Sequence, residues 1–272
     1  MTLLHRGITF CNFDGTYELQ SELRSITPHK WIDFRNLRGT HLYCSPEAFT
    51  AISHKLANTE LSGLTFLGSG NYHYATLALL QKIPQPFSLI LFDHHTDLKE
   101  GRIGNLLSCG SWVRHALSDV ANLKKVIIVG PDPPEDELKL LQGHYQVTLF
   151  PERSLPSAQR LISSIPTQAV YMSIDKDLIS EQEAKTNWDQ GHLSINRLAQ
   201  LLATIIENKQ VEGIDVCGEW PVQPHQELDQ RTRAWIRKNE LCNLRIVHAY
   251  LNHLHSVDRR KMIHKGSSKH VM

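Results

Sequence analysis

Two motifs in the sequence place carboxylates and an imidazole at a spacing that suits metal binding. The first, Asp93-His94-His95-Thr96-Asp97, directly follows the apolar run 87–92. Residues two apart on an extended backbone point to the same side, so Asp93, His95 and Asp97 would present two carboxylates and one imidazole together. These groups are common metal ligands. The alternative for this motif alone is a polar turn in which an Asp caps the next helix.

The second motif, Ser173-Ile174-Asp175-Lys176-Asp177, ends another apolar run and again places two carboxylates on one side. Alone it is weak, because Asp-x-Asp is common in ordinary turns. Together, the two motifs put four carboxylates at the ends of two strands of one sheet, where they would repel one another unless cations neutralised them. Two divalent ions carry the matching charge.

A third segment, Gly68-Ser69-Gly70-Asn71-Tyr72-His73, could add an imidazole at another strand end. Its Gly-x-Gly is poor evidence for a phosphate loop, because the remaining spacing of that fingerprint is missing. Taken alone, His73 is more often a structural histidine than a ligand. His73 becomes a candidate metal ligand because the other two motifs supply further ligands at the ends of strands in the same sheet.

The elements that must position these motifs follow an alternating pattern. Short apolar runs end in polar or glycine clusters and are followed by segments of helical period, which is typical of a mostly parallel sheet. We expect a three-layer α/β/α fold in which the motifs gather at the carboxyl ends of the strands. The predicted strands are 64–68, 87–93, 125–130, 147–150, 169–175 and 213–217, and the predicted helices are 45–56, 74–83, 111–117, 134–141, 194–207 and 228–255.

Length and composition favour one globular domain. The chain has 272 residues, 41% of them hydrophobic and 21% charged, and we assign a single α/β domain to 1–258 and a flexible polar tail to 259–272. Lys and Arg total 29 against 28 acidic residues, so no basic field is available for nucleic acid or a membrane surface. The five cysteines are widely separated and odd in number, which favours a reducing, cytoplasmic location. No run approaches the roughly 20 apolar residues of a membrane span.

The order of the three motifs resembles the ureohydrolases, the arginase and agmatinase family, over roughly residues 60–225. That family carries a Gly-Gly-Asp-His turn, then Asp-Ala-His-x-Asp, then Ser-x-Asp-x-Asp. The resemblance implies an arginase-like fold and two Mn²⁺ ions per chain, and it suggests a homo-oligomer by analogy. It also implies a ligand set in which Asp93 and Asp175 bridge the ions, His73 and Asp97 serve one ion, and His95 and Asp177 serve the other.

The chemistry that the resemblance implies is hydrolysis of a guanidino group to release urea. Asp97 is expected to hydrogen-bond the attacking nucleophile and to pass a proton to the leaving amine. The planar guanidinium cation needs an anionic partner, and relatives supply an acid after a late strand. Here the candidate is Glu219, one position later than the family places it. The alternative for Glu219 is a surface acid or the start of a helix.

The chain departs from the family in two places. Cys109 stands where relatives carry a proton-relaying histidine, so either His94 substitutes for it or the substrate differs; a small buried side chain is an equal alternative for Cys109. The loop 98–105, which recognises the α-amino and α-carboxylate groups in free-arginine enzymes, is shorter and altered. We therefore expect an arginine side chain within a precursor peptide as substrate. Alternatives are free arginine, agmatine, another guanidino or formimino compound, and a metal-binding protein without turnover.

Overall fold

The computed structural model describes residues 7–26, 28–60, 62–100, 104–134, 138 and 146–267, with the backbone alone for 253–267. Its centre is one eight-stranded sheet in the order β2-β1-β3-β8-β7-β4-β5-β6, and all of its strand pairs are parallel. The strands are β1 (Ile8–Asn12), β2 (His29–Asp33), β3 (Leu64–Phe66), β4 (Phe87–Phe92), β5 (Leu123–Gly130), β6 (Val147–Pro151), β7 (Ala169–Asp175) and β8 (Gln210–Cys217).

All six predicted strands are present, as β3 to β8. The central strands β4 and β7 are buried along their whole length, as their continuous apolar sequences indicate. The prediction did not include β1 and β2. β2, of sequence HKWID, is an edge strand with mostly exposed or half-buried residues, so it lacks the apolar run by which the other strands are found.

The helices confirm most of the helical pattern. α2 (Pro46–Ala57) and α7 (Ile195–Asn208) begin at Ser45 and Ser194, whose side chains accept hydrogen bonds from backbone N–H groups of the first turn. α4 (Trp112–Asp119) matches 111–117, whereas the segment expected at 74–83 is a 3-10 turn (Gly70–Ala75) followed by the short α3 (Thr76–Leu80). The prediction did not include α1 (Ser21–Ser25) or α6 (Ala158–Ser163). Most of the helix predicted at 134–141 lies outside the described residues.

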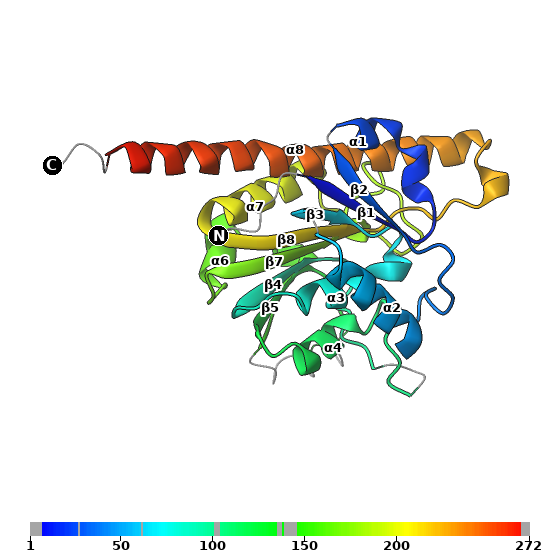
Figure 1. The fold of residues 1–272 in the computed structure, drawn as a ribbon, viewed down its shortest axis with the longest axis horizontal. Coiled ribbons are helices and arrows are strands. Elements are labelled where there is room, and N and C mark those ends of the chain that lie inside the picture. The colour runs from blue at the N-terminus through cyan, green and yellow to red at the C-terminus, as the bar shows by residue number, and fades with distance from the viewer. Residues whose placement is uncertain are drawn as a thin grey trace.

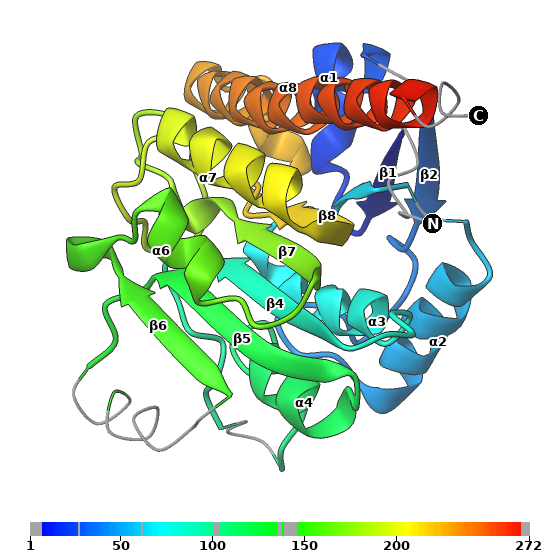
Figure 2. The same cartoon turned by 90° about the vertical axis from the view of Figure 1, so that its left-hand side faces the viewer.

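Helices cover both faces of the sheet, which confirms the three-layer architecture. In Figure 1, α1, α7 and α8 (Gln230–Ser267) lie above the strands, and α2, α3 and α4 lie below them; Figure 2 shows α6 beside α7 over β6 and β7. One core joins α7 and α8 to the sheet through residues such as Leu202 and Val247. The other joins α2 and α4 to the opposite face through Ile52 and Trp112.

Helix α8 is longer than expected. Its backbone is helical to Ser267, past the end predicted at 255, and it extends beyond the edge of the sheet in Figure 1. The helix therefore includes residues 259–267, and the proposed division into a domain and a flexible tail at 258 stays a prediction. All five cysteines are free and buried. Among the described residues, no helix has both the length and the apolar character needed to cross a bilayer.

We expect Leu202→Ala to lower the free energy of unfolding by about 2–5 kcal/mol. Leu202 is 1% exposed in the core between α7 and the sheet, so truncation leaves a cavity. Chemical denaturation monitored by circular dichroism measures the change. Gln200→Ala, at an exposed position of the same helix, is the control and should change stability by no more than about 0.5 kcal/mol. Equal effects of the two substitutions would contradict this packing.

Candidate metal centre

The sheet order brings the three motifs to one place. β3, β8, β7 and β4 are consecutive neighbours, and all end on the same edge because the sheet is parallel. His73 lies in the 3-10 turn that follows β3, Asp93 follows β4 directly, and Asp175 ends β7. Two crossovers in the chain order therefore bring together side chains that are up to about a hundred positions apart in the sequence.

The first ligand cluster surrounds His73. Its Nδ1 lies 3.1 Å from Asp97 Oδ2, 3.3 Å from Asp93 Oδ2 and 3.6 Å from Asp175 Oδ2. All four residues are buried, at most 6% exposed. Asp93 Oδ2 has no hydrogen-bond partner among the described residues, although a buried carboxylate oxygen normally has one. A buried carboxylate oxygen without a hydrogen-bond partner indicates a binding position for a cation.

The second cluster surrounds His95. Its Nδ1 lies 2.8 Å from Asp177 Oδ2 and 3.6 Å from Asp93 Oδ1, and the three ligand atoms lie within 4.8 Å of one another. Asp93 belongs to both clusters, one oxygen to each, as a bridging ligand would. Asp175 Oδ2 faces His73, and its Oδ1 accepts a hydrogen bond from Asp177 N at 2.9 Å. Its bridging role stays a prediction. The structure thus brings together all six predicted ligands.

The pKa values of the clustered carboxyl groups indicate an excess of negative charge at this site. Burial and the neighbouring Asp93 charge raise the pKa of Asp97 to about 6 and also raise the pKa of Asp175. Burial, with the charges of Asp175 and Asp93, raises the pKa of Asp177 well above its ordinary value. Burial acts in the same direction on Asp93, but the adjacent His73 and His95 rings outweigh it and lower that pKa. Cations at this site would relieve the repulsion among the carboxylates.

A chain of hydrogen bonds below the cluster orients His73. Ser173 Oγ donates to Asp215 Oδ1 at 2.7 Å, so its own lone pair faces His73 Nε2 at 2.8 Å. Nε2 of His73 is therefore the proton donor to Ser173, and Nδ1 is the nitrogen that faces the carboxylates and would bind an ion once it has lost its proton. This is the arrangement by which proteins fix the tautomer of a metal-binding histidine. Ser173, Asp215 and Asp175 share one face of β7 and β8 through the two-residue period.

Trp112 orients Asp97 in a similar way. The indole Nε1 donates to Asp97 Oδ2 at 2.6 Å, and the ring lies 4.8 Å from that of His73. Asp97 has a φ of 52°, an uncommon conformation for a residue other than glycine, and such strain often occurs at functional sites. The sequence marks Trp112 only as an aromatic residue near the motifs, because the bond joins a loop to a helix fifteen positions away.

Two glycines leave room for the carboxylates. A Cβ on Gly70 would come within 2.8 Å of Asp175 Oδ2 and 3.1 Å of Trp188. Gly218 has a φ of +87°, and a Cβ there would overlap Asp175 Oδ1. The close approach of backbone to this carboxylate explains glycine at both positions.

A narrow pocket of about 40 Å³ opens over the cluster. Besides the predicted ligands, it is lined by Gly70, Lys99, Cys109, Gly110 and Trp188. Cys109 therefore lies where its candidate role requires, but burial raises the pKa of its thiol to about 12, so it is a neutral group at physiological pH. His94 does not line the pocket; its backbone N–H donates to Asp177 Oδ1 at 3.0 Å, and its ring lies edge-on to that of His95.

Glu219 is placed differently from the predicted role. It is 1% exposed, does not line the pocket, and is paired with the fully buried Lys176. Gln20 Nε2 donates to its Oε2 at 2.9 Å, and Asn243 Nδ2 donates to its Oε1 at 2.7 Å. Both oxygens are thus engaged with protein groups on the α8 side of the motif. In this arrangement Glu219 neutralises Lys176, and its role in holding a guanidinium ion stays a prediction.

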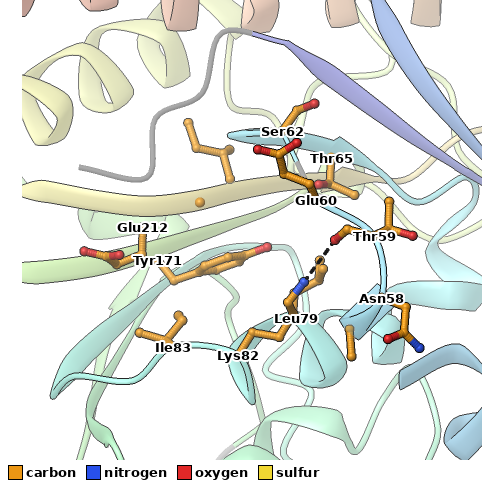
Figure 3. A pocket seen from close by; sticks show the side chains of 13 residues that line it. Asn58, Thr59, Glu60, Ser62, Thr65, Leu79, Lys82, Ile83, Tyr171 and Glu212 are labelled. Atoms are coloured by element: carbon orange, nitrogen blue, oxygen red, sulfur yellow. Dashed lines mark hydrogen bonds between the residues drawn. The ribbon is translucent and has the colours of Figure 1, made fainter. Parts of the chain in front are cut away.

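Figure 3 shows another cavity, which contains none of the predicted site residues. It measures about 460 Å³ and lies between the end of α2, α3 and the first half of β8. Lys82 donates to Thr59 O at 3.4 Å beside it, and Tyr171 and Glu212 contribute to its wall. Its polar groups include no ligand cluster like that around His73. Chemistry therefore favours the smaller pocket as the functional site.

The fold and the site define an α/β protein with a cluster of histidine and aspartate metal-ligand candidates at the carboxyl edge of a parallel sheet, and comparison with known proteins gives the family. The Arginase family model matches residues 12–237, and the chain belongs to that family. Its members are hydrolases of guanidino and amidino carbon–nitrogen bonds. An uncharacterized protein of Thermotoga maritima is 31% identical over 228 residues, covering 82% of this chain and 86% of that relative.

Solved structures with similar folds include two hydrolases. Proclavaminate amidino hydrolase from Streptomyces clavuligerus superposes with a TM-score of 0.62 at 17% identity, covering 90% of this chain and 91% of that one. Agmatine ureohydrolase of Thermoplasma volcanium gives 0.63 at 12% identity, covering 94% and 93%. At these identities the likeness establishes the arginase-like fold.

We expect Ser173→Ala to weaken divalent-metal binding by about 10–100-fold, because His73 loses the partner that fixes its tautomer. Calorimetric titration of chelator-treated protein with Mn²⁺ measures the affinity. Ser88→Ala is a matched control, since Ser88 is also buried on a central strand but bonds to Thr167, away from the cluster. If Ser173→Ala bound Mn²⁺ as tightly as the control, the orienting role of Ser173 would be wrong.

We expect Glu219→Gln to lower the free energy of unfolding by about 3–5 kcal/mol, because it leaves the Lys176 ammonium buried without a counter-charge. Urea denaturation measures this. The control is Glu60→Gln, which removes an exposed ion pair with Lys30 and should cost less than about 1 kcal/mol. Adding Lys176→Met to Glu219→Gln should restore part of the loss. Unchanged stability with a selective loss of guanidino turnover would instead support the clamping role.

Proposed function

We propose that the protein is a two-metal hydrolase that cleaves the guanidino group of an arginine side chain within a peptide, giving ornithine and urea. The observation that carries the proposal is the convergence of His73, Asp93, Asp97 and Asp175 with His95 and Asp177 at the carboxyl edge of the sheet. The family of the chain supports the reaction class. The peptide substrate is the more specific part of the proposal and rests on the shape of the site.

The donor set fits two divalent ions. Asp93 offers one oxygen to each cluster, and four carboxylates with two imidazoles balance four positive charges. Oxygen ligands with one imidazole per ion suit Mn²⁺, which is the metal we propose. When bound, the two ions lower the pKa of water and so supply a nucleophile at neutral pH.

The side chains of this protein would transfer the proton and position the substrate. Asp97, held by Trp112, is the proposed proton carrier between the nucleophile and the leaving amine; its carboxyl group reaches the first cluster and the pocket. The stem of the substrate would pass between Trp188 and Gly110 at the pocket wall.

Two features support a substrate whose body lies outside the pocket. The pocket has room for little more than the reacting group. A second cavity of about 380 Å³ lies beside it along the same edge of the sheet, lined by residues that include Asp14, His41, Asn71 and Glu227. Asn71 separates the two: its Oδ1 accepts from Trp188 Nε1 at 3.2 Å, and its Nδ2 lies 3.2 Å from His41 Nε2. Peptide residues next to the arginine could occupy this second cavity.

A small guanidino or amidino compound is the second candidate substrate. Proclavaminate amidino hydrolase and agmatine ureohydrolase share the fold and are named for small substrates. The engagement of Glu219 with Lys176 favours neither candidate, since both substrates carry a planar cation.

The test is urea release by Mn²⁺-loaded protein from free arginine, agmatine and a peptide with an internal arginine. We expect urea from the peptide only. Asp97→Asn should lower the rate by about 10²–10⁴-fold, the usual contribution of a positioned acid–base group. Asp119→Asn, an exposed aspartate at the end of α4, is the matched control and should retain the rate.

Each other outcome has a definite meaning. Urea from arginine or agmatine but not from the peptide would reject the peptide substrate and retain the ureohydrolase activity. No urea from any substrate, in protein that binds two metal ions, would reject guanidino hydrolysis. An active Asp97→Asn variant would reject the role of Asp97.

A further inference from the structure

The metal centre has one buried neighbour that its predicted ligand set does not use. Cys217 ends β8 beside Asp175 of β7, and the register of the two parallel strands pairs these residues directly. The Cys217 side chain is 0% exposed. Its Sγ lies 3.1 Å from Asp175 Oδ2, the oxygen that faces His73. The thiol therefore borders the first cluster from the side of β8.

Cys217 lies close enough to His73 and Asp175 for all three residues to bind one ion. One ligand atom each from His73, Asp175 and Cys217 lie within 4.8 Å of one another. Asp175 Oδ2 is the oxygen that faces both His73 Nδ1 and Cys217 Sγ, so it is the atom that this residue would offer to an ion here. An independent sign that a cation belongs at this point is Asp93 Oδ2, which is buried beside His73 without a hydrogen-bond partner among the described residues.

We propose that Cys217 is a further metal ligand, whose thiolate binds the ion held by His73 and Asp175. This inference rests on the metal centre of the proposed function and adds a sulfur donor to its oxygen and nitrogen ligands. Binding forms a sulfur–metal bond and breaks the S–H bond, and the proton is released to solvent, as in other cysteine metal sites. In the metal-free structure the thiol instead donates its proton to Asp175.

A thiolate changes which ion the site prefers. Carboxylates and water suit Mn²⁺, whereas sulfur ligands favour softer ions such as Zn²⁺. Affinity for divalent ions also rises along the series from Mn²⁺ through Fe²⁺ and Co²⁺. The site should therefore bind Co²⁺ or Zn²⁺ with a greater advantage over Mn²⁺ than an oxygen and nitrogen site provides. Cys109, which lines the pocket without belonging to a ligand cluster, offers a matched thiol for comparison.

The experiment loads chelator-treated full-length protein with Co²⁺ alone and records its absorption spectrum. We expect a near-ultraviolet thiolate-to-cobalt charge-transfer band in the wild type and in Cys109→Ser, and loss of this band in Cys217→Ser and Cys217→Ala. Calorimetric titration should show that loss of Cys217 lowers Co²⁺ affinity by about tenfold or more, with a smaller change for Mn²⁺.

The outcomes separate this inference from the proposed function. Stoichiometric Co²⁺ binding without the band, or a band that persists in both Cys217 variants, would overturn the thiolate ligand and leave the metal centre intact. Absence of any Co²⁺ or Mn²⁺ binding would overturn both. If neither Cys217 variant folds, X-ray absorption of the cobalt-loaded wild type decides: a sulfur scatterer in the first coordination shell supports the proposal, and its absence rejects it.

Discussion

Repulsion among buried carboxylates is the constraint on which this structure depends. Asp93, Asp97, Asp175 and Asp177 lie within a few ångströms of two imidazoles, almost out of contact with water. A fold does not gather such charges at no cost, since each loses hydration and repels the others. Their presence is explained by cations that would pair with them, and the surrounding structure is arranged to hold the carboxylates in place until then.

Side chains and glycines around the cluster fix the positions of its ligands. Ser173 and Asp215 orient His73 from below, Trp112 fixes Asp97 from α4, and Gly70 and Gly218 leave space for Asp175. Between Asp175 and Asp177, the chain is anchored to α8 through Lys176, whose ammonium pairs with Glu219 within a buried network that includes Asn243. The long C-terminal helix is thus connected to the motif that carries two of the metal ligands. Substitution of any of these residues is expected to weaken metal binding because it shifts a ligand from its position.

Several side chains next to the predicted ligands give this site its own chemistry. Cys109 and Cys217 place two thiols near the predicted ligands, one lining the pocket and one against Asp175. Lys176 stands between the two aspartates of the third motif and engages Glu219. The predicted ligands themselves are all present and adjacent. Because ligands set the reaction and their neighbours tune it, these groups bear on the substrate and metal preference of the site.

Period-two spacing at strand ends and apolar stripes on helices are local properties, so the strands β3 to β8, the helices with clear stripes and the six metal-ligand candidates could be predicted from the sequence. Only the tertiary structure revealed the edge strand β2, whose residues are mostly exposed or half-buried, the inner strand β1 beside it, and the neighbours supplied by distant segments. It also decided that Glu219 pairs with Lys176 and that Cys217 faces Asp175. These contacts depend on strand order and register, which no local pattern in the chain encodes.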